Sequence, residues 1–333
     1  RKEPWAWGRL PDVAARLRYA RYIAARYGAY DVYFLVAGEW HGEARSRRAP
    51  EREVRSEFVQ IGDALRAADP HHRMIGIHPM TAHGSTREFN DAARWMDFAD
   101  YQQNYRDLHL RVLASRAVAK PVVNAEYGYY LRDQNADGKV DKPNSYTVDD
   151  MRHATWDLVL AGGYVVTGFG STYMGGNRHP TPFLPDDPKN AIWAEQIGRV
   201  KAFFAELEYW KFEPHDELLS TPTLRPPDRT NQVKLGSGQE LTLTQPPATA
   251  YWCLAGPGRV HAAYLRGTKA PVALRVSGGG TWQVTRFDPR TGKSERVAAS
   301  VGNGEVRWNA PDERDWVFVV REYGRSSATR SGR

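Results

Sequence analysis

The chain has 333 residues, of which 41% are hydrophobic and 26% charged, with a formal net charge of +7 and one cysteine, Cys253. This composition is that of a globular protein with a packed core, and the length allows two domains. A single cysteine excludes an intrachain disulfide and a cysteine-based zinc cluster. No apolar run approaches the roughly 18 residues of a membrane span, and the scattered charges carry no nucleic-acid-binding motif. We therefore expect neither a membrane nor a nucleic-acid partner.

Helical patterns alternate with short apolar runs through the first two thirds of the chain. The predicted elements are a helix over 13–27 opened by Pro11-Asp12 and closed by Gly28, a strand over 31–37, a helix over 54–65, strands over 74–77, 95–101 and 121–125, a helix to 160 opened by a Thr147/Asp150 capping box, a strand over 163–169 and a helix over 193–207. This alternation indicates a parallel sheet, either open or part of a closed barrel. No glycine-rich nucleotide loop follows these strands, which disfavours a dinucleotide-binding fold.

From about Ser220 the pattern changes to short alternating runs separated by proline-rich connectors. The predicted strands cover 250–254, 260–265, 272–276, 282–287, 305–308 and 316–320. They indicate an antiparallel β-sandwich. We therefore expect a barrel region over 1–214, a β-sandwich accessory domain over 215–324 and a disordered tail over 325–333.

Two glutamates follow predicted buried strands: Glu39 ends VYFLVAGE and Glu126 ends KPVVNAE. In parallel α/β folds the functional residues gather at the carboxyl ends of the strands. Glycoside hydrolysis needs two such carboxyl groups, one to protonate the leaving oxygen and one to attack the sugar or activate water. Each glutamate could instead pair with a neighbouring arginine, but two of them near aromatic residues favour catalysis.

Several passages resemble the apiosidase-like glycoside hydrolases of clan A. They are YARYIAARYGAYDVYFLVAGEW (19–40), DPHHRMIGIHP (69–79), WMDFADYQQNY (95–105), KPVVNAEYGYY (120–130) and WDLVLAGGYVVTGFG (156–170). The later segments WQVTRFDPRTG (282–292) and WVFVVRE (316–322) resemble the collagen-binding β-domain often fused to that barrel. The resemblance implies an α/β protein with a (β/α)8 TIM barrel and a C-terminal antiparallel β-sandwich, located outside the cell or in the periplasm.

If residues 31–37 form the fourth barrel strand, strands one to three are missing from this sequence. Five βα units cannot close an eight-stranded barrel, and open edges expose apolar surface. We therefore expect a longer protein, and we expect these 333 residues alone to be inactive and poorly soluble.

The resemblance implies separate roles for the two glutamates. Glu39 would be the proton donor and Glu126 the nucleophile of a retaining glycosidase that needs no cofactor, with about 5–5.5 Å between the carboxyl groups. Glu43 is a rival for the acid, because Gly38 stands where clan members often have asparagine and relatives can have aspartate as the acid. The substrate-binding candidates are Trp40, His41, His78, Gln102, Asn104, Tyr105, Tyr127 and Tyr173.

A further motif follows the predicted strand over 121–125, which leads to Glu126. Residues 133–141 (DQNADGKVD) match the first nine positions of a calcium-binding loop, in which alternate oxygen ligands surround the ion. The candidate ligands are Asp133, Asn135, Asp137, Lys139 and Asp141. Asn144 stands where an acidic ligand is expected, and a polar turn is the alternative. Calcium here would be structural.

The sequence thus predicts a secreted glycosidase that cleaves side chains of plant or microbial cell-wall polysaccharides. The resemblance suggests a pectic side chain with apiose or arabinose. The alternative is a non-catalytic carbohydrate- or matrix-binding protein on a barrel scaffold. An esterase-like hydrolase is disfavoured, because the G-x-S-x-G motif is absent. Linkage, endo or exo action, oligomeric state and the ligand of the β-domain are left open.

Overall fold

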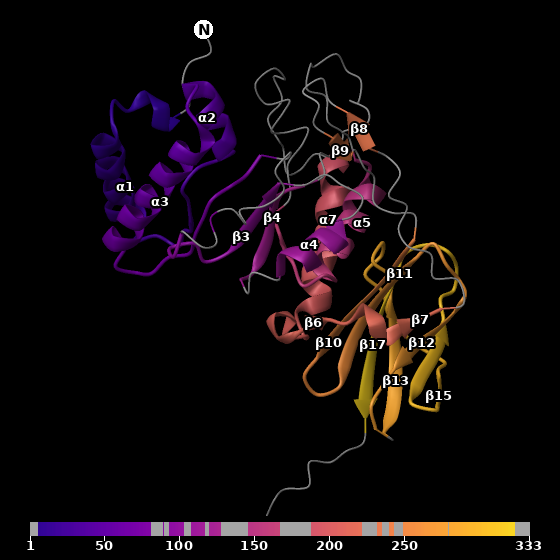
Figure 1. The fold of residues 1–333 in the computed structure, drawn as a ribbon. Coiled ribbons are helices and arrows are strands. Elements are labelled where there is room, and N and C mark those ends of the chain that lie inside the picture. The colour runs from indigo at the N-terminus through magenta and orange to yellow at the C-terminus, as the bar shows by residue number, and fades with distance from the viewer. Residues whose placement is uncertain are drawn as a thin grey trace, which may run out of the picture.

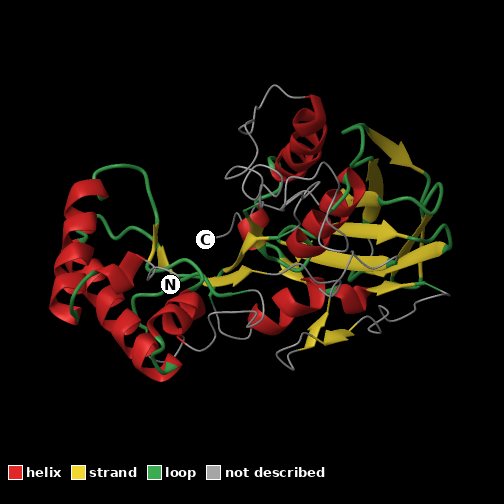
Figure 2. Ribbon diagram, turned by 90° about the horizontal axis from the view of Figure 1, so that it is seen from above, coloured by secondary structure: helices red, strands yellow, loops and turns green. Residues whose placement is uncertain are grey.

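The computed structural model describes residues 6–80, 89, 93–102, 108–116, 120–127, 146–166, 188–221, 232–234, 240–242, 249–278 and 280–323 (Figure 1). The described helices are α1 (Val13–Tyr27), α2 (Trp40–Arg47), α3 (Glu51–Ala68), α4 (Leu108–Arg116), α5 (Val148–Val159) and α7 (Pro188–Phe204), with short 3-10 helices η1 (Ala6–Arg9), η4 (Tyr209–Lys211) and η5 (Asp216–Leu218). Helices α1 to α3 form the N-terminal end of the molecule, and an antiparallel β region forms the opposite end (Figures 1 and 2).

The helix signals of the sequence are largely confirmed. Helix α1 begins where the Asp12 carboxylate accepts a hydrogen bond of 2.7 Å from the backbone N–H of Ala15. Helix α5 begins with the predicted capping box of Thr147 and Asp150. Helix α2 was not predicted, because its sequence WHGEARSR carries no apolar stripe of helical period.

Short parallel strands run through the middle of the molecule. They are β1 (Phe34–Leu35), β2 (Ile75–Gly76), β3 (Ala99–Gln102), β4 (Val122–Glu126) and β5 (Tyr164–Val165). Strand β1 pairs with β2, and β3, β4 and β5 pair in that order, all in parallel. The backbone N–H of Asp97, just before β3, donates a hydrogen bond of 2.9 Å to the carbonyl of Ile75 in β2. Each strand thus lies beside its successor, as in a β/α barrel, although the described strands do not close into one.

The C-terminal β region contains two antiparallel sheets. The six-stranded sheet has the order β14 (Ser294–Val297), β13 (Thr281–Phe287), β17 (Trp316–Tyr323), β11 (Val260–Arg266), β10 (Ala250–Gly256) and β6 (Glu213–Pro214). The four-stranded sheet has the order β15 (Ser300–Gly302), β16 (Glu305–Asn309), β12 (Pro271–Arg275) and β7 (Leu219–Ser220). A separate pair joins β8 (Gln232–Lys234) and β9 (Glu240–Thr242). The predicted antiparallel strands are therefore present. The short strands β6 to β9 were not predicted, nor were β14 and β15, which are mostly exposed.

Each face of the six-stranded sheet packs against a different partner. Inward-facing side chains such as Phe318 share a core with Leu274 and Trp308 of the four-stranded sheet. The opposite face contributes Tyr264 and Val317 to a second core shared with α5 and α7. The β region is thus packed directly against the helices that follow β4 and β5.

No helix in the described part of the chain is long and apolar enough to cross a membrane.

Candidate active site

The first two strands bring Glu39 and His78 together. Hydrogen bonding between β1 and β2 continues past their ends, from the backbone N–H of His78 to the carbonyl of Ala37 (2.9 Å) and from the N–H of Trp40 to the carbonyl of His78 (3.1 Å). Glu39 therefore lies beside His78 at the carboxyl end of this strand pair. Both residues come just after a buried apolar segment of the chain, as the sequence predicted.

The next two strands supply Gln102 and Glu126. Gln102 is paired with Glu126 across a β-bulge at the end of β3 and β4, an irregularity that often re-aims side chains at functional sites. The amide of Gln102 donates a hydrogen bond of 3.0 Å to Oε1 of Glu39. The two predicted catalytic glutamates are therefore linked through one residue, which is hydrogen bonded to the first and paired with the second.

His78 joins Glu126 to a buried aspartate. Its Nδ1 lies 3.0 Å from Oδ2 of Asp100, and its Nε2 lies 3.2 Å from Oε2 of Glu126. Burial acts to lower the pKa of His78, but the hydrogen bonds and charges of the two carboxylates raise this pKa to about 9. At neutral pH the imidazolium therefore donates a hydrogen bond to each carboxylate and holds Glu126 in one orientation.

The two glutamates stay accessible. The Glu126 side chain is 21% exposed, and Glu39 is half-buried. Among the described residues, no arginine or lysine forms an ion pair with either carboxylate. A Cβ placed on Gly38 would meet nothing within 4 Å, so the space beside Glu39 is open.

Glu39 also has an unusual backbone conformation. Its φ of 44° lies in the left-handed region, which non-glycine residues adopt uncommonly and which is found often at functional sites. The chain turns there into helix α2, so the Glu39 side chain leaves the face of that helix and reaches Gln102.

Glu43, the rival acid, lies in a different environment. Its side chain is buried and accepts a hydrogen bond from the backbone of Gly8. Burial raises its pKa, whereas the charges of Arg47 and Arg16 oppose this rise. Both arginines form ion pairs with Glu57 of α3, at 2.9 and 2.8 Å. Glu43 therefore belongs to a charged cluster between helices and not to the group at the strand ends.

The other predicted sugar contacts divide into three groups. His78 and Gln102 belong to what we call the strand-end network, the linked group of Glu39, His78, Asp100, Gln102 and Glu126 at the ends of β1 to β4. Trp40, His41 and Tyr127 are almost fully buried, with the Tyr127 hydroxyl 2.7 Å from Oγ1 of Thr155, so these three do not form the exposed aromatic wall that we expected. Asn104, Tyr105 and Tyr173 lie outside the described residues.

The predicted calcium loop, residues 133–141, also lies outside the described residues. Within the described part of the chain, no group of three or more His, Cys, Asp or Glu side chains could hold a metal ion.

Two buried polar residues beside the site, Asp100 and Asn124, were not predicted from the sequence. Asp100 is the partner of His78, and Asn124 accepts a hydrogen bond of 3.3 Å at its Oδ1 from the backbone N–H of Glu126. Each stands two residues before a predicted site residue on the same strand, Gln102 or Glu126. Because side chains two apart share one face of a strand, this spacing was a usable signal.

Residues 4–211 match the family described as "Apiosidase-like, catalytic domain". The chain belongs to the apiosidase-like catalytic domain family. The match stops before most of the β region, so it does not test the predicted likeness of that region to a collagen-binding domain. Membership of this family indicates a glycoside hydrolase that acts on a carbohydrate. No curated protein matches the chain by sequence.

Solved structures share the fold of this apiosidase-like chain at low sequence identity. One, titled "Glycoside hydrolase", has a TM-score of 0.68 and 15% identity over 95% of this chain and 70% of its own. A GH30 endoxylanase from Clostridium papyrosolvens C71 has a TM-score of 0.53 and 13% identity over 93% and 72%. An Anoxybacillus α-amylase has a TM-score of 0.53 and 8% identity over 97% and 70%.

Proposed function

We propose that the protein is a retaining glycosidase in which Glu126 is the nucleophile and Glu39 the acid/base. The observation that supports this most is the strand-end network, in which Gln102 holds Glu39 while His78 holds Glu126. Four consecutive parallel strands contribute to it, and its two glutamates remain accessible and unpaired with any described arginine. A binding protein would have no need for a buried His–Asp pair behind one of two accessible carboxylates.

The first half of the reaction breaks the glycosidic bond. A carboxylate oxygen of Glu126 attacks the anomeric carbon while Glu39 gives its proton to the leaving oxygen, which forms a glycosyl ester on Glu126 and releases the alcohol. The hydrogen bond from His78 keeps Glu126 oriented. Because Gln102 donates to Oε1 of Glu39, the transferable proton belongs on Oε2 of that residue.

The second half consumes water. Glu39, now a carboxylate, takes a proton from a water molecule as the water oxygen attacks the anomeric carbon, and Glu126 leaves as a carboxylate. The anomeric configuration is retained after two inversions. The Oε1 atom of Gln102 is buried and has no hydrogen-bond partner in the described part of the chain, so it can accept from a sugar hydroxyl.

We propose that the substrates are neutral side chains of cell-wall polysaccharides, cleaved outside the cytoplasm. This rests on the family likeness of the chain. A pectic side chain with terminal apiose or arabinose is the first substrate to screen with the full-length protein.

Replacing each carboxylate tests the roles. Glu126→Gly should abolish turnover, and added azide should restore it by forming a glycosyl azide of inverted configuration. Glu39→Ala should lose about 10²–10⁴-fold on substrates with a poor leaving group and much less on activated aryl glycosides. Azide should then give the retained glycosyl azide.

Glu43→Gln provides the matched control for the acid. We expect it to keep most of the activity, because Glu43 lies in the cluster of Arg16, Arg47 and Glu57. If Glu43→Gln showed the leaving-group dependence and Glu39→Ala did not, the acid would be Glu43. Full activity of the Glu126→Gly protein without azide would rule out the mechanism.

A further inference from the structure

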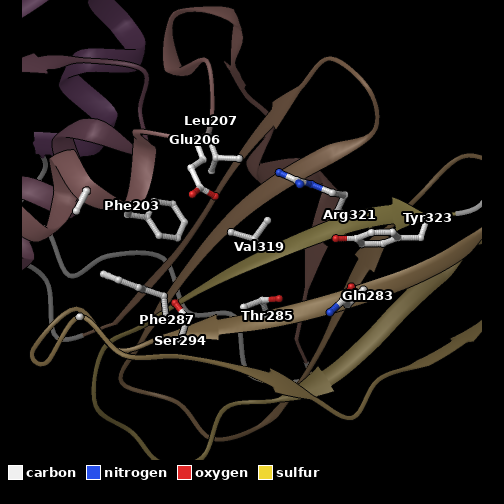
Figure 3. Close-up of a pocket in the computed structure, with 12 residues that line it drawn as sticks. Phe203, Glu206, Leu207, Gln283, Thr285, Phe287, Ser294, Val319, Arg321 and Tyr323 are labelled. Atoms are coloured by element: carbon white, nitrogen blue, oxygen red, sulfur yellow. The ribbon is translucent and has the colours of Figure 1, made fainter.

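A second pocket lies between the C-terminal end of α7 and the outer face of the six-stranded sheet (Figure 3). Its volume is about 430 Å³, within the range of about 300–1,000 Å³ typical of small-molecule sites. None of its lining residues belongs to the strand-end network. The family match and the proposed mechanism therefore leave this pocket without a role.

The register of two strands builds its floor. Gln283 and Thr285 of β13 pair with Arg321 and Val319 of β17, respectively. Because alternate residues of a strand share a face, these side chains and that of Tyr323 project from the outer face of the sheet. The residues between them, such as Trp282 and Val284, face the sandwich core. A polar patch thus stands on a sheet that is apolar underneath.

Two side chains of opposite charge project into the pocket from its two walls. Glu206 extends from the helix side and Arg321 from the sheet side (Figure 3). In the described part of the chain, neither side chain forms an ion pair. The Nε of Arg321 is buried and has no hydrogen-bond partner there, so a ligand or water that provided an acceptor would remove the cost of leaving this donor unpaired.

Aromatic rings complete the pocket at both ends. Tyr323 is 48% exposed at one end, whereas Phe203 and Phe287 stand at the other end. Flat apolar rings between separate donors and acceptors suit a molecule that has apolar C–H faces and hydroxyl edges. Hydroxyl groups can donate hydrogen bonds to Glu206 and accept them from Arg321, whereas an anionic ligand would be repelled by the carboxylate of Glu206.

We propose that this pocket is an accessory site that binds a neutral oligosaccharide, with hydroxyls held by Glu206, Gln283 and Arg321 and a sugar face stacked on Tyr323. It would anchor a polysaccharide chain on the protein at a distance from the strand-end carboxylates. The inference extends beyond catalysis, because the pocket would bind its ligand whether or not Glu39 and Glu126 are catalytic.

Calorimetric titration of the full-length protein tests the proposal. The Glu126→Gln variant is used, so that the probes are not consumed. The probes are arabino-, xylo- and galacto-oligosaccharides, with oligogalacturonate as the charged comparison. At least one neutral probe should bind, and Arg321→Met and Tyr323→Ala should each weaken that binding tenfold or more. The matched controls are Arg307→Met, in the other sheet, and Tyr22→Ala, an exposed tyrosine of α1; both should bind normally.

A second measurement guards against variants that fail to fold. In the unsubstituted pocket, the NMR signals of Gln283, Thr285 and Tyr323 should shift as the neutral probe is added. Affinity that is unchanged in folded pocket variants, absence of these shifts, or lack of binding by every neutral probe would overturn the proposal. Tighter binding of oligogalacturonate than of the neutral probes would also overturn it.

Discussion

Replacing His78 by glutamine should change how the stability of the protein depends on pH. The carboxylates of Asp100 and Glu126 raise the pKa of His78 from its usual 6.5 to about 9, against the effect of burial. A group with a raised pKa in the folded state stabilises that state fully below its unfolded pKa. This stabilisation is lost as the pH rises through the folded pKa. The relevant window is therefore pH 6.5 to 9.

The size of the effect follows from the shift. Each pKa unit equals about 1.4 kcal/mol, so the rise from 6.5 to about 9 corresponds to at most about 3.5 kcal/mol. The Glu126 side chain is 21% exposed, and solvent screening weakens that half of the interaction. We therefore expect about 2 kcal/mol of stability to be lost across the window.

Urea unfolding at intervals from pH 6 to 9.5 measures this loss directly. The free energy of unfolding of the His78→Gln protein should fall less over the window than that of the parent, because all other titrating groups are shared. His71→Gln removes an exposed histidine and should follow the parent curve. If the parent and His78→Gln curves ran parallel from pH 6.5 to 9, His78 would not be charged in the folded protein and the argument would fail.

Three further predictions concern stability. Arg152→Met should destabilise the protein by about 3–5 kcal/mol in urea unfolding, because Asp315, which accepts hydrogen bonds of 2.7 and 2.8 Å from it, would be left buried without this partner; a loss below 1 kcal/mol would contradict this. Gly62→Ala should cost about 1–3 kcal/mol although alanine favours helix, because its Cβ would lie 2.1 Å from Cε2 of buried Trp95. If residues 133–141 bind calcium, removal with EDTA should lower the melting temperature and added Ca²⁺, but not Mg²⁺, should restore it; an unchanged melting temperature would count against the loop.

Strand ends were the most predictable part of the candidate site. The apolar runs before Glu39, His78 and Glu126 mark buried strands, and a polar residue at the end of such a run stands out in the sequence. The role of Asp100 was harder to see, since Asp97 precedes it by three residues in the same segment. The odd spacing puts the two acids on opposite faces. The Asp97 carboxylate accepts a hydrogen bond from the backbone N–H of Ile75, whereas the Asp100 carboxylate forms a hydrogen bond with the ring of His78.

The choice between Glu39 and Glu43 depended on a feature that sequence patterns do not contain. Residues four apart on a helix share a face, so a helix through both would have brought the two acids together. The left-handed conformation of Glu39 separates them and sends Glu43 toward Gly8. Glutamate has no special preference for this conformation, so the packing around residues 37–40 must impose it. The burial of Trp40 is part of that packing.

The junction between α5 and the β region explains why a pocket built from two units can have a fixed shape. Asp157 of α5 forms a buried ion pair of 3.0 Å with Arg266 of β11, and it accepts a hydrogen bond of 2.7 Å from the indole of Trp252 in β10. Trp156, beside it, stacks on Tyr264. Such buried contacts oppose the relative motion expected of units joined by small polar interfaces. Because the sheet wall and the helix wall of the pocket are fixed by the same core, a ligand there would lose little of its binding free energy to ordering the protein.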